Sequence, residues 1–334
     1  MSKRRGRMAE LYLRAGMRAI LYAATFGLSC LASVPAGAQE RSFCVLVPHF
    51  KDEYWLSVAY GIEQASRQHD VAPRFFEAGG YRAREQQLRQ LETCERLGVE
   101  AILIGAVTSD HPDLLAAIER AARAVPVIAL VNELHSDALS ARVGVDWRDM
   151  GLELGRFLTE LHPQGTPPQT AVLLSGPEES GWVAPVELGL KAGLADAAIQ
   201  IAAVFRADTG QSEQLDALER ALRAYPAPDY IIGPAPAIEA AMGLIDAGSA
   251  AKAPKLVATY VSHSVRRGLV NGRVLVAPND DPQAQGTMAV EVMLRVLSGE
   301  KIGGLAGPDI RLVTRVTSLE GVRLSPADYF PYIE

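Results

Sequence analysis

Short apolar runs alternate along this chain with stretches in which apolar residues recur every three or four positions. The run at 43–47 is almost wholly apolar, which is typical of a strand buried on both faces of a sheet. From about Ser57 onward the spacing is helical, with Val58 and Ile62 on one face. The pattern therefore predicts a strand, a loop at 48–56 and a helix, which together begin an α/β unit.

The same alternation continues almost to the end of the chain. Further strands are predicted at 73–77, 101–104, 126–131, 141–145, 171–174, 201–205, 230–232, 256–260 and 274–277. Further helices are predicted at 84–97, 111–123, 149–162, 185–197, 212–224, 235–247 and 284–298. Repeated β-α-β order predicts parallel sheets with helices on both faces, so the fold class is α/β.

The first 38 residues differ from the rest in pattern. A basic start is followed by an apolar run at 19–34 and by small residues at 36–38, the arrangement that a signal peptidase requires. A membrane anchor is the alternative, but the run is short for a bilayer span. We therefore predict a signal peptide at 1–38, a periplasmic mature protein that begins at Gln39, and no direct insertion into a membrane.

Two consecutive α/β runs in one exported chain indicate a type I periplasmic binding protein, in which two Rossmann-like lobes with parallel sheets close around a ligand. No Pro/Ser-rich linker separates the runs, which fits a hinge made of several chain crossings. We expect these crossings near 144–146, 278–282 and 301–307. The predicted lobes are an N-terminal one of residues 39–145 plus 278–303 and a C-terminal one of residues 146–277 plus 304–334.

Composition and motifs argue for a binding protein. The chain has 334 residues, of which 49% are hydrophobic, and its net charge of −6 argues against a nucleic-acid surface. No nucleophile elbow or glycine-rich phosphate loop follows a predicted strand. The six histidines are scattered without metal-ligand spacing; only His49 and His263 are expected near the cleft, as structural residues. We predict no enzyme activity, no catalytic residue, no metal and no cofactor.

Two of the three cysteines remain once the predicted signal peptide is removed. Cys44 lies in the first strand and Cys94 near the end of the helix that precedes the next strand. An even pair in an oxidising compartment predicts a disulfide, and a β-α-β unit brings such a helix onto its sheet. Two buried thiols are the alternative. Cys30 is not a convincing lipoprotein site, because no small residue follows it.

Four motifs narrow the prediction further: DEYWLSVAYG, EAGGY, GVDW followed by Met150 and Gly151, and TYVSHSVRRGLVNGRV. Together and in this order they resemble the periplasmic TorT-like proteins, the binding component of a trimethylamine N-oxide respiration sensor. The resemblance covers nearly the whole mature chain. It implies a two-lobe fold, trimethylamine N-oxide as the ligand, and the periplasmic domain of a membrane sensor histidine kinase as the partner.

The chemistry of the candidate residues agrees with that ligand. Trimethylamine N-oxide carries three methyl groups on a positive nitrogen and one oxide that only accepts hydrogen bonds. A site for it needs electron-rich ring faces around the methyl groups and a few donors for the oxide. By the resemblance, ligand contact is expected from Tyr54, Trp55, Tyr81, Trp147, Tyr260 and Asp52.

Several alternatives stay open at this point. The rings could pack in the core, and Asp52 and Asp146 could cap the helices that follow them. With the acidic and amide residues at 279–281, these aspartates also keep a sugar site possible, in a binding protein that serves an ABC transporter. Trp182 stands where the family has a small residue and could face the cleft or the lobe surface.

Overall fold

The structure is a computed structural model that describes residues 41–247, 253–317 and 319–334. The predicted signal peptide at 1–38 and the predicted first mature residue, Gln39, lie outside these described residues. Among the described residues, no helix has the length and apolar character that crossing a membrane requires.

The first sheet has the strand order β11-β5-β4-β3-β1-β2, and all neighbouring strands are parallel. Its strands are β1 (Ser42–Val47), β2 (Ala72–Glu77), β3 (Ile102–Ile104), β4 (Val127–Leu130), β5 (Ala141–Val143) and β11 (Leu305–Ala306). Every side chain of β3 and β4 is buried, which explains their unbroken apolar sequences. We call this sheet and the helices that pack on it the first lobe.

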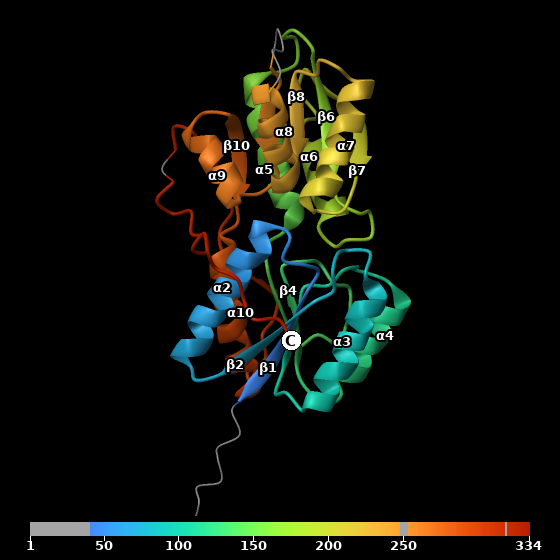
Figure 1. Cartoon of the computed structure of the whole chain (residues 1–334), viewed down its shortest axis with the longest axis vertical. Helices are drawn as coiled ribbons and strands as arrows, with labels where there is room; N and C mark the ends of the chain where they lie inside the picture. The colour runs from blue at the N-terminus through green and yellow to red at the C-terminus, as the bar shows by residue number, and fades with distance from the viewer. Residues whose placement is uncertain (1–40, 248–252, 318) are drawn as a thin grey trace, which may run out of the picture. The chain divides into compact units, whose positions relative to one another are not determined.

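Two pairs of helices cover the first sheet (Figure 1). On one face, α2 (Glu53–Gln68) packs against α10 (Pro282–Leu297), although the two helices are far apart in the sequence. On the other face, α3 (Arg84–Leu97) packs against α4 (Pro112–Ala121). The first sheet is therefore covered on both faces, as its apolar strands require.

The second sheet has the strand order β12-β10-β9-β8-β6-β7. Its strands are β6 (Gln169–Ser175), β7 (Ile199–Arg206), β8 (Tyr230–Gly233), β9 (Lys255–Ala258), β10 (Val274–Asn279) and β12 (Arg311–Thr314). All neighbours are parallel except β12, which runs antiparallel to β10. We call this sheet and its helices the second lobe.

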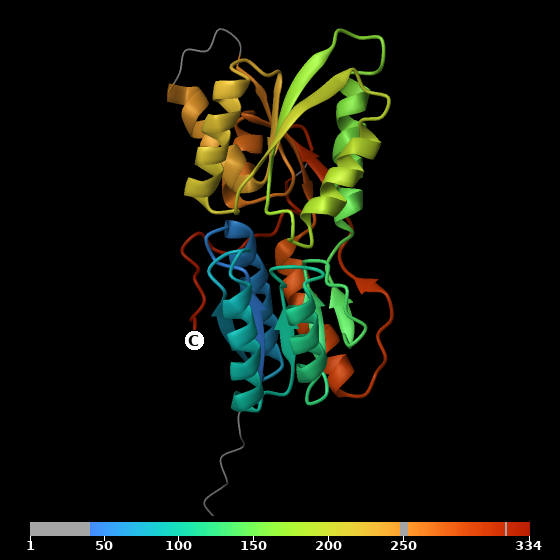
Figure 2. The ribbon, with the colours of Figure 1, turned by 90° about the vertical axis from the view of Figure 1, so that its right-hand side faces the viewer.

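Helices also cover both faces of the second sheet (Figure 2). On one face lie α5 (Trp147–Leu161) and α6 (Val183–Gly193), which pack against each other. On the other lie α7 (Gln211–Ala224), α8 (Ala235–Ala247) and α9 (His263–Val270). The predicted α/β class with two parallel sheets is confirmed. The pattern did not predict α9, β11 or β12; of the two strands, β11 has no buried residue and β12 has one, so neither is an apolar run.

The helix α2 begins earlier than the pattern predicted. It starts at Glu53 rather than near Ser57, because the Asp52 side chain caps it by accepting a hydrogen bond of 3.0 Å from the Tyr54 amide. Tyr54 and Trp55 therefore lie in the first turn of a helix and not in a loop, as the sequence had suggested. Their side chains leave a rigid element, which holds them more firmly than a loop would.

Glycines allow α2 and α10 to cross with their backbones in contact. A Cβ atom on Gly61 would lie 2.0 Å from the carbonyl oxygen of Gln283, and one on Gly286 would lie 2.0 Å from that of Val58. Only glycine avoids both clashes. The α5–α6 pair in the second lobe crosses in a similar way. This close approach brings the start of α10 against the second and third turns of α2, with Gln285 within hydrogen-bond distance of the Tyr54 hydroxyl.

A disulfide joins Cys44 of β1 to Cys94 of α3, with the two Cα atoms 6.2 Å apart. Both residues are completely buried between the first sheet and its α3–α4 layer. The predicted disulfide is therefore confirmed, and the alternative of two buried thiols does not apply.

The chain passes repeatedly from one sheet to the other, after β5, after β10 and after β11. Beyond β12 the tail returns to the first lobe, where Ile333 forms a bridge with Phe75 and Glu334 pairs with Arg74. Strand pairing thus places β11 and the end of the tail with the first sheet, whereas the predicted boundaries assign both to the second lobe. The lobe boundaries as a whole stay a prediction.

Candidate functional site

Six aromatic side chains from both lobes surround one small cavity. They are Tyr54 and Trp55 in the first turn of α2, Tyr81 after β2, Trp147 at the start of α5, Trp182 before α6 and Tyr260 after β9. None is more than 5% exposed. The structure thus brings together all five rings that the sequence singled out, with Asp52 on the same wall, and adds Trp182. We call these six rings the cage.

Neighbouring rings of the cage contact one another at an angle. The centroids of Tyr54 and Tyr260 lie 5.2 Å apart with the ring planes at 70°. Trp182 lies 5.9 Å from Trp147 and 6.5 Å from Tyr81. Ring faces carry partial negative charge, so a cage of this kind attracts a positive, weakly hydrated group without a formal countercharge inside it.

The cavity is small enough to restrict its ligand severely. The space open to the centre of a water-sized sphere is about 10 Å³. That is about the room that one water molecule needs, so the rings enclose very little free space. The lining also includes the polar side chains of Asn132 and Thr209.

Asp52 connects the two lobes at the cavity wall. Its Oδ1 caps α2, and its Oδ2 accepts a short hydrogen bond from the hydroxyl of Tyr260 in the second lobe. Burial raises the pKa of the Asp52 carboxyl to about 6, although the hydrogen bonds from Tyr260 and from the Tyr54 amide act in the opposite direction. Burial and the Asp52 charge together raise the pKa of Tyr260 well above its usual value, so this phenol keeps its proton.

A second buried carboxylate stands behind Tyr54. The Tyr54 hydroxyl donates a hydrogen bond of 2.6 Å to Oδ2 of Asp280, which also accepts one of 2.8 Å from Nε2 of Gln285. Burial raises the pKa of Asp280 to about 6, against the hydrogen bonds from Tyr54 and Gln285. Asp280 precedes α10, so the glycine-mediated crossing of α2 and α10 is what brings this pair together.

Tyr81 has different partners from the other two tyrosines. Its hydroxyl oxygen accepts a hydrogen bond of 3.3 Å from Nδ2 of Asn132, which also donates one of 2.8 Å to the carbonyl oxygen of Ala106. Its backbone amide donates one of 2.9 Å to Asp208 in the second lobe. Burial raises the pKa of the Tyr81 phenol far above physiological pH, although hydrogen bonds from Asn132 and Trp55 lower it.

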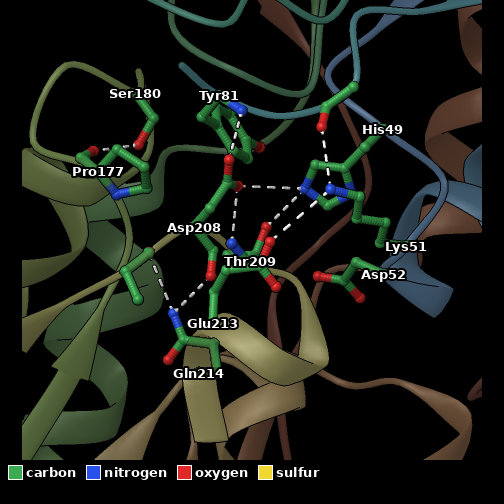
Figure 3. A network of polar contacts seen from close by, with 12 residues as sticks. His49, Lys51, Asp52, Tyr81, Pro177, Ser180, Asp208, Thr209, Glu213 and Gln214 are labelled. Carbon is green, nitrogen blue, oxygen red and sulfur yellow. Dashed lines mark hydrogen bonds and ion pairs between the residues drawn. The ribbon is translucent and has the colours of Figure 1, made fainter. Parts of the chain in front are cut away.

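His49 joins the lobes beside the cage (Figure 3). Its Nε2 lies 2.9 Å from Oγ1 of Thr209 and 3.5 Å from Oδ1 of Asp208, and its ring is completely buried. Burial alone would raise the pKa of Asp208, but the contact with His49 and the amides of Thr209 and Tyr81 bring it below its usual value. His49 was expected to be structural, and its contacts are with protein groups of both lobes.

Of the polar residues that kept a sugar site open, Asp52 lines the cavity and the others do not. Asp146 is exposed and caps α5, which starts at Trp147, through a hydrogen bond of 2.8 Å from the Arg148 amide. Asp281 caps α10 and pairs with Arg323 at 2.6 Å. Neither lines the cavity, so a set of hydroxyl-binding carboxylates around a large ligand is not formed here.

Sequence reasoning missed several members of the site. Trp182 was left undecided, and its place on the cavity depends on how the chain enters α6. Asn132 and Thr209 follow β4 and β7, at the carboxyl ends of strands where α/β folds bind ligands. That position was a usable signal. Asp280 was noted only as part of a polar turn, because nothing in its neighbourhood in the sequence points to Tyr54.

Known proteins of this fold resemble the chain closely. The sequence profile described as a periplasmic binding protein domain matches residues 43–301. The "Periplasmic protein TorT" of Escherichia coli K12 is 36% identical over 306 residues, which are 90% of this chain and 86% of that protein.

Solved structures of related proteins have the same fold as this chain. The complex of the TorS sensor domain with TorT, determined without ligand, matches with a TM-score of 0.77 and 35% identity over 88% of this chain and 100% of that one. The same complex in the presence of TMAO also matches with a TM-score of 0.77, and its identity is 34% over 88% of this chain and 100% of that one. An ABC transporter solute-binding protein from Bradyrhizobium sp. BTAi1 with bound Bis-Tris matches with a TM-score of 0.72. Its identity is 34% over 89% of this chain and 90% of that one.

These matches span both lobes and extend over nearly all of the described residues. They confirm the family to which the four sequence motifs pointed, and with it the periplasmic location predicted from the sequence. The chain belongs to the periplasmic binding protein family, and within that family it is a relative of the TorT proteins.

Proposed function

We propose that this protein binds trimethylamine N-oxide in the cage and reports its presence to the periplasmic domain of a membrane sensor histidine kinase. The observation that carries the proposal is a small cavity walled by six aromatic rings and by polar groups at a few points. Trimethylamine N-oxide has five non-hydrogen atoms, three of which are methyl carbons that need apolar, electron-rich surroundings.

Charge placement supports the same ligand. The positive nitrogen is shielded by its methyl groups, so it is recognised by ring faces rather than by a direct ion pair. Asp52 and Asp280 accept hydrogen bonds from Tyr260 and Tyr54, which increases the electron density of those rings. The two carboxylates thus add attraction for the cationic end of the ligand without occupying space in the cavity.

Cavity size argues against a sugar. A hexose has more than twice as many non-hydrogen atoms as trimethylamine N-oxide and presents a hydroxyl on nearly every carbon. It would need a larger void and more hydrogen-bonding side chains than this cavity has. Only Asp52, Asn132 and Thr209 among the lining side chains are polar and non-aromatic, and each already has a partner in the protein.

A signalling role is supported by the relatives. The solved complexes that match 88% of this chain pair TorT with the TorS sensor domain, with and without TMAO. Here, contacts on both sides of the cavity join the two lobes, so the closed arrangement offers a partner a surface to which both lobes contribute. A partner that prefers this arrangement changes the ligand affinity by the same factor by which the ligand changes the partner's affinity. We infer a binding role rather than a catalytic one.

Calorimetry tests the ligand assignment. Protein purified from the periplasmic fraction is titrated with trimethylamine N-oxide and, separately, with glucose and arabinose. We expect saturable binding of the N-oxide and no heat from the sugars. Binding of a sugar without binding of the N-oxide would refute the assignment. Size-exclusion chromatography with the kinase's purified sensor domain tests the partner, since a complex should form whose affinity or size depends on the N-oxide.

A transport role is the second candidate, because one relative of 34% identity is a solute-binding protein of an ABC transporter. Transport and sensing use the same closing lobes, so the cavity does not distinguish them. Co-purification with a membrane permease, together with no complex with the kinase domain, would favour transport.

A further inference from the structure

A strained turn follows β4 of the first lobe. Among the non-glycine residues that the structure describes, three have a positive φ: Asp70, Val131 and Asp281. Aspartate tolerates this left-handed region, but a β-branched valine rarely adopts it, because its Cβ atom crowds the backbone. Val131 has a φ of 66° and is buried. Its conformation therefore costs free energy, which contacts with the surrounding structure must offset.

Two hydrogen bonds define the turn around Val131. The amide of Asn132 donates one of 2.7 Å to the carbonyl oxygen of Leu130, which closes a three-residue γ-turn with Val131 at its centre. The form of this turn with a positive φ is the rare and strained one. The amide of Val131 donates one of 2.7 Å to the carbonyl oxygen of Val143 in β5. The turn is thus bonded to two strands of the first sheet.

The turn directs one carbonyl group toward the second lobe. In a trans peptide unit the carbonyl and the N–H point in opposite directions, and the N–H between Val131 and Asn132 points to Leu130. The Val131 carbonyl therefore points away from Leu130. It accepts a hydrogen bond of 3.0 Å from the indole N–H of Trp147, the first residue of α5. A negative φ at Val131 would give this carbonyl another direction.

The turn also lies against the hinge. A Cβ atom on Gly144 would lie 3.0 Å from the carbonyl oxygen of Val131, and one on Gly307 would lie 1.7 Å from that of Gly144. Gly144 begins the crossing that follows β5, and Gly307 begins the crossing that follows β11. Two passages of the chain between the lobes are therefore stacked on this turn by backbone contact. A movement of the lobes that shifts these passages reaches Val131 directly.

We propose that Val131 is a positioning residue whose backbone strain sets the affinity of the site by opposing lobe closure. Closure brings Trp147 to the Val131 carbonyl and holds the turn in its strained form. When the lobes part, this hydrogen bond is lost and the turn relaxes. The strain therefore favours the open arrangement in the absence of ligand. A sensor benefits, because a protein that closes by itself would report a ligand that is absent.

This proposal goes beyond the proposed function, because it concerns the hinge and applies to any ligand that closes the lobes. Its test compares glycine with alanine at position 131. The valine side chain lines the cavity, and both replacements remove its methyl groups, but only glycine adopts a positive φ without strain.

Trimethylamine N-oxide is titrated by calorimetry into the unchanged mature protein and into its Val131→Gly and Val131→Ala variants. We expect Val131→Gly to bind the N-oxide about 5- to 30-fold more tightly than Val131→Ala, which corresponds to the usual cost of a left-handed residue. Small-angle X-ray scattering without ligand gives a second readout. Val131→Gly should have a smaller radius of gyration than Val131→Ala, because its closed arrangement is more populated.

A matched pair of variants at Val143 is the control. Val143 is buried beside the turn, but it lies in β5 and does not have a positive φ. Val143→Gly should therefore bind the N-oxide no more tightly than Val143→Ala, and the two should have the same radius of gyration. Thermal melting confirms that each variant is folded.

The outcomes separate this proposal from the proposed function. Where the N-oxide binds, the affinities decide: equal affinities of Val131→Gly and Val131→Ala, or weaker binding by Val131→Gly, would overturn the role of Val131. The same gain in the Val143 pair would also overturn it, because glycine would then act through flexibility alone. If the unchanged protein does not bind the N-oxide, the proposed function fails. The scattering comparison then decides about Val131, and equal radii of gyration would overturn its role.

Discussion

The hydroxyl of Tyr260 in the second lobe donates a hydrogen bond to the carboxylate of Asp52, the residue that caps the first helix of the first lobe. One side chain thus starts a helix, holds the lobes together and forms part of the cavity wall. The bond joins the two lobes, so a movement of the lobes apart would break it. We therefore expect ligand binding and lobe closure to be linked at this residue.

Trp55 and Trp147 should contribute to ligand binding through the faces of their rings. Replacing Trp55 or Trp147 by Ala should weaken trimethylamine N-oxide binding by about 1–3 kcal/mol, because a desolvated cation–π contact and its packing are lost. Phe at the same positions should retain more of the affinity than Ala. Titration calorimetry measures both. Equal losses for Ala and Phe would mean that the indole N–H, and not the ring face, is what matters.

The stability of the protein should depend on pH through Asp52. Its pKa is raised by burial from the ordinary 3.8 to about 6, so the folded state holds this proton more tightly than the unfolded state. The free energy of unfolding therefore falls as pH rises through this interval and levels off above it. Asp52→Asn, which can still cap α2, removes this contribution.

Urea unfolding at a series of pH values provides the measurement for Asp52. The free energy of unfolding of Asp52→Asn minus that of the unchanged protein should increase by roughly 1–3 kcal/mol as pH rises from 4 to 7. The comparison cancels the contribution of Asp280, which is present in both proteins. A stability difference that does not vary with pH would contradict the raised pKa.

The disulfide should stabilise the first lobe. Replacing Cys44 and Cys94 by Ala removes a link between β1 and α3 that spans 50 residues, and should lower the free energy of unfolding by about 2–4 kcal/mol. Alkylation of the unreduced protein followed by mass spectrometry should find neither cysteine modified. Two alkylated cysteines would show that the link does not form in the periplasm.

The contact of His49 with Asp208 should favour the closed arrangement. Asp208 does not line the cavity, but it accepts hydrogen bonds that depend on closure. Asp208→Ala should therefore weaken N-oxide binding roughly tenfold, since a hydrogen bond to a charged group contributes about 1.5–3 kcal/mol. Lys51→Ala is the matched control, because its exposed pair with Glu213 at 3.8 Å also joins the lobes but should contribute little.

Small-angle X-ray scattering distinguishes the cause of a lower affinity in Asp208→Ala. At saturating ligand the variant should reach the same radius of gyration as the unchanged protein, while at low ligand it should be more open. Equal effects of Asp208→Ala and Lys51→Ala on affinity would argue against a specific role for the contact of His49 with Asp208.

The alternation of strands and helices, and with it the α/β fold, could be predicted from the sequence because buried parallel strands are unbroken apolar runs. The five predicted rings could be found because each lies just after a strand or at the start of a helix. What could not be predicted depends on neighbours distant in the sequence. Asp280 meets Tyr54 only through the crossing of two helices, and the direction of Trp182 depends on a loop. The first turn of α2 was missed because the capping role of Asp52 was left open.

The first lobe is assembled from both ends of the described chain, since α10, β11 and the end of the tail join the five strands that come first. This order has a consequence for biosynthesis. While the polypeptide is being made, this face of the first sheet is covered by α2 alone, and α10 can join it only after synthesis has passed Leu297. A protein that must be translocated before it folds benefits from such a delay, because its amino-terminal half cannot reach a finished, translocation-resistant state on its own. The contacts between distant residues that define the lobe also predict slow folding once the chain has reached the periplasm.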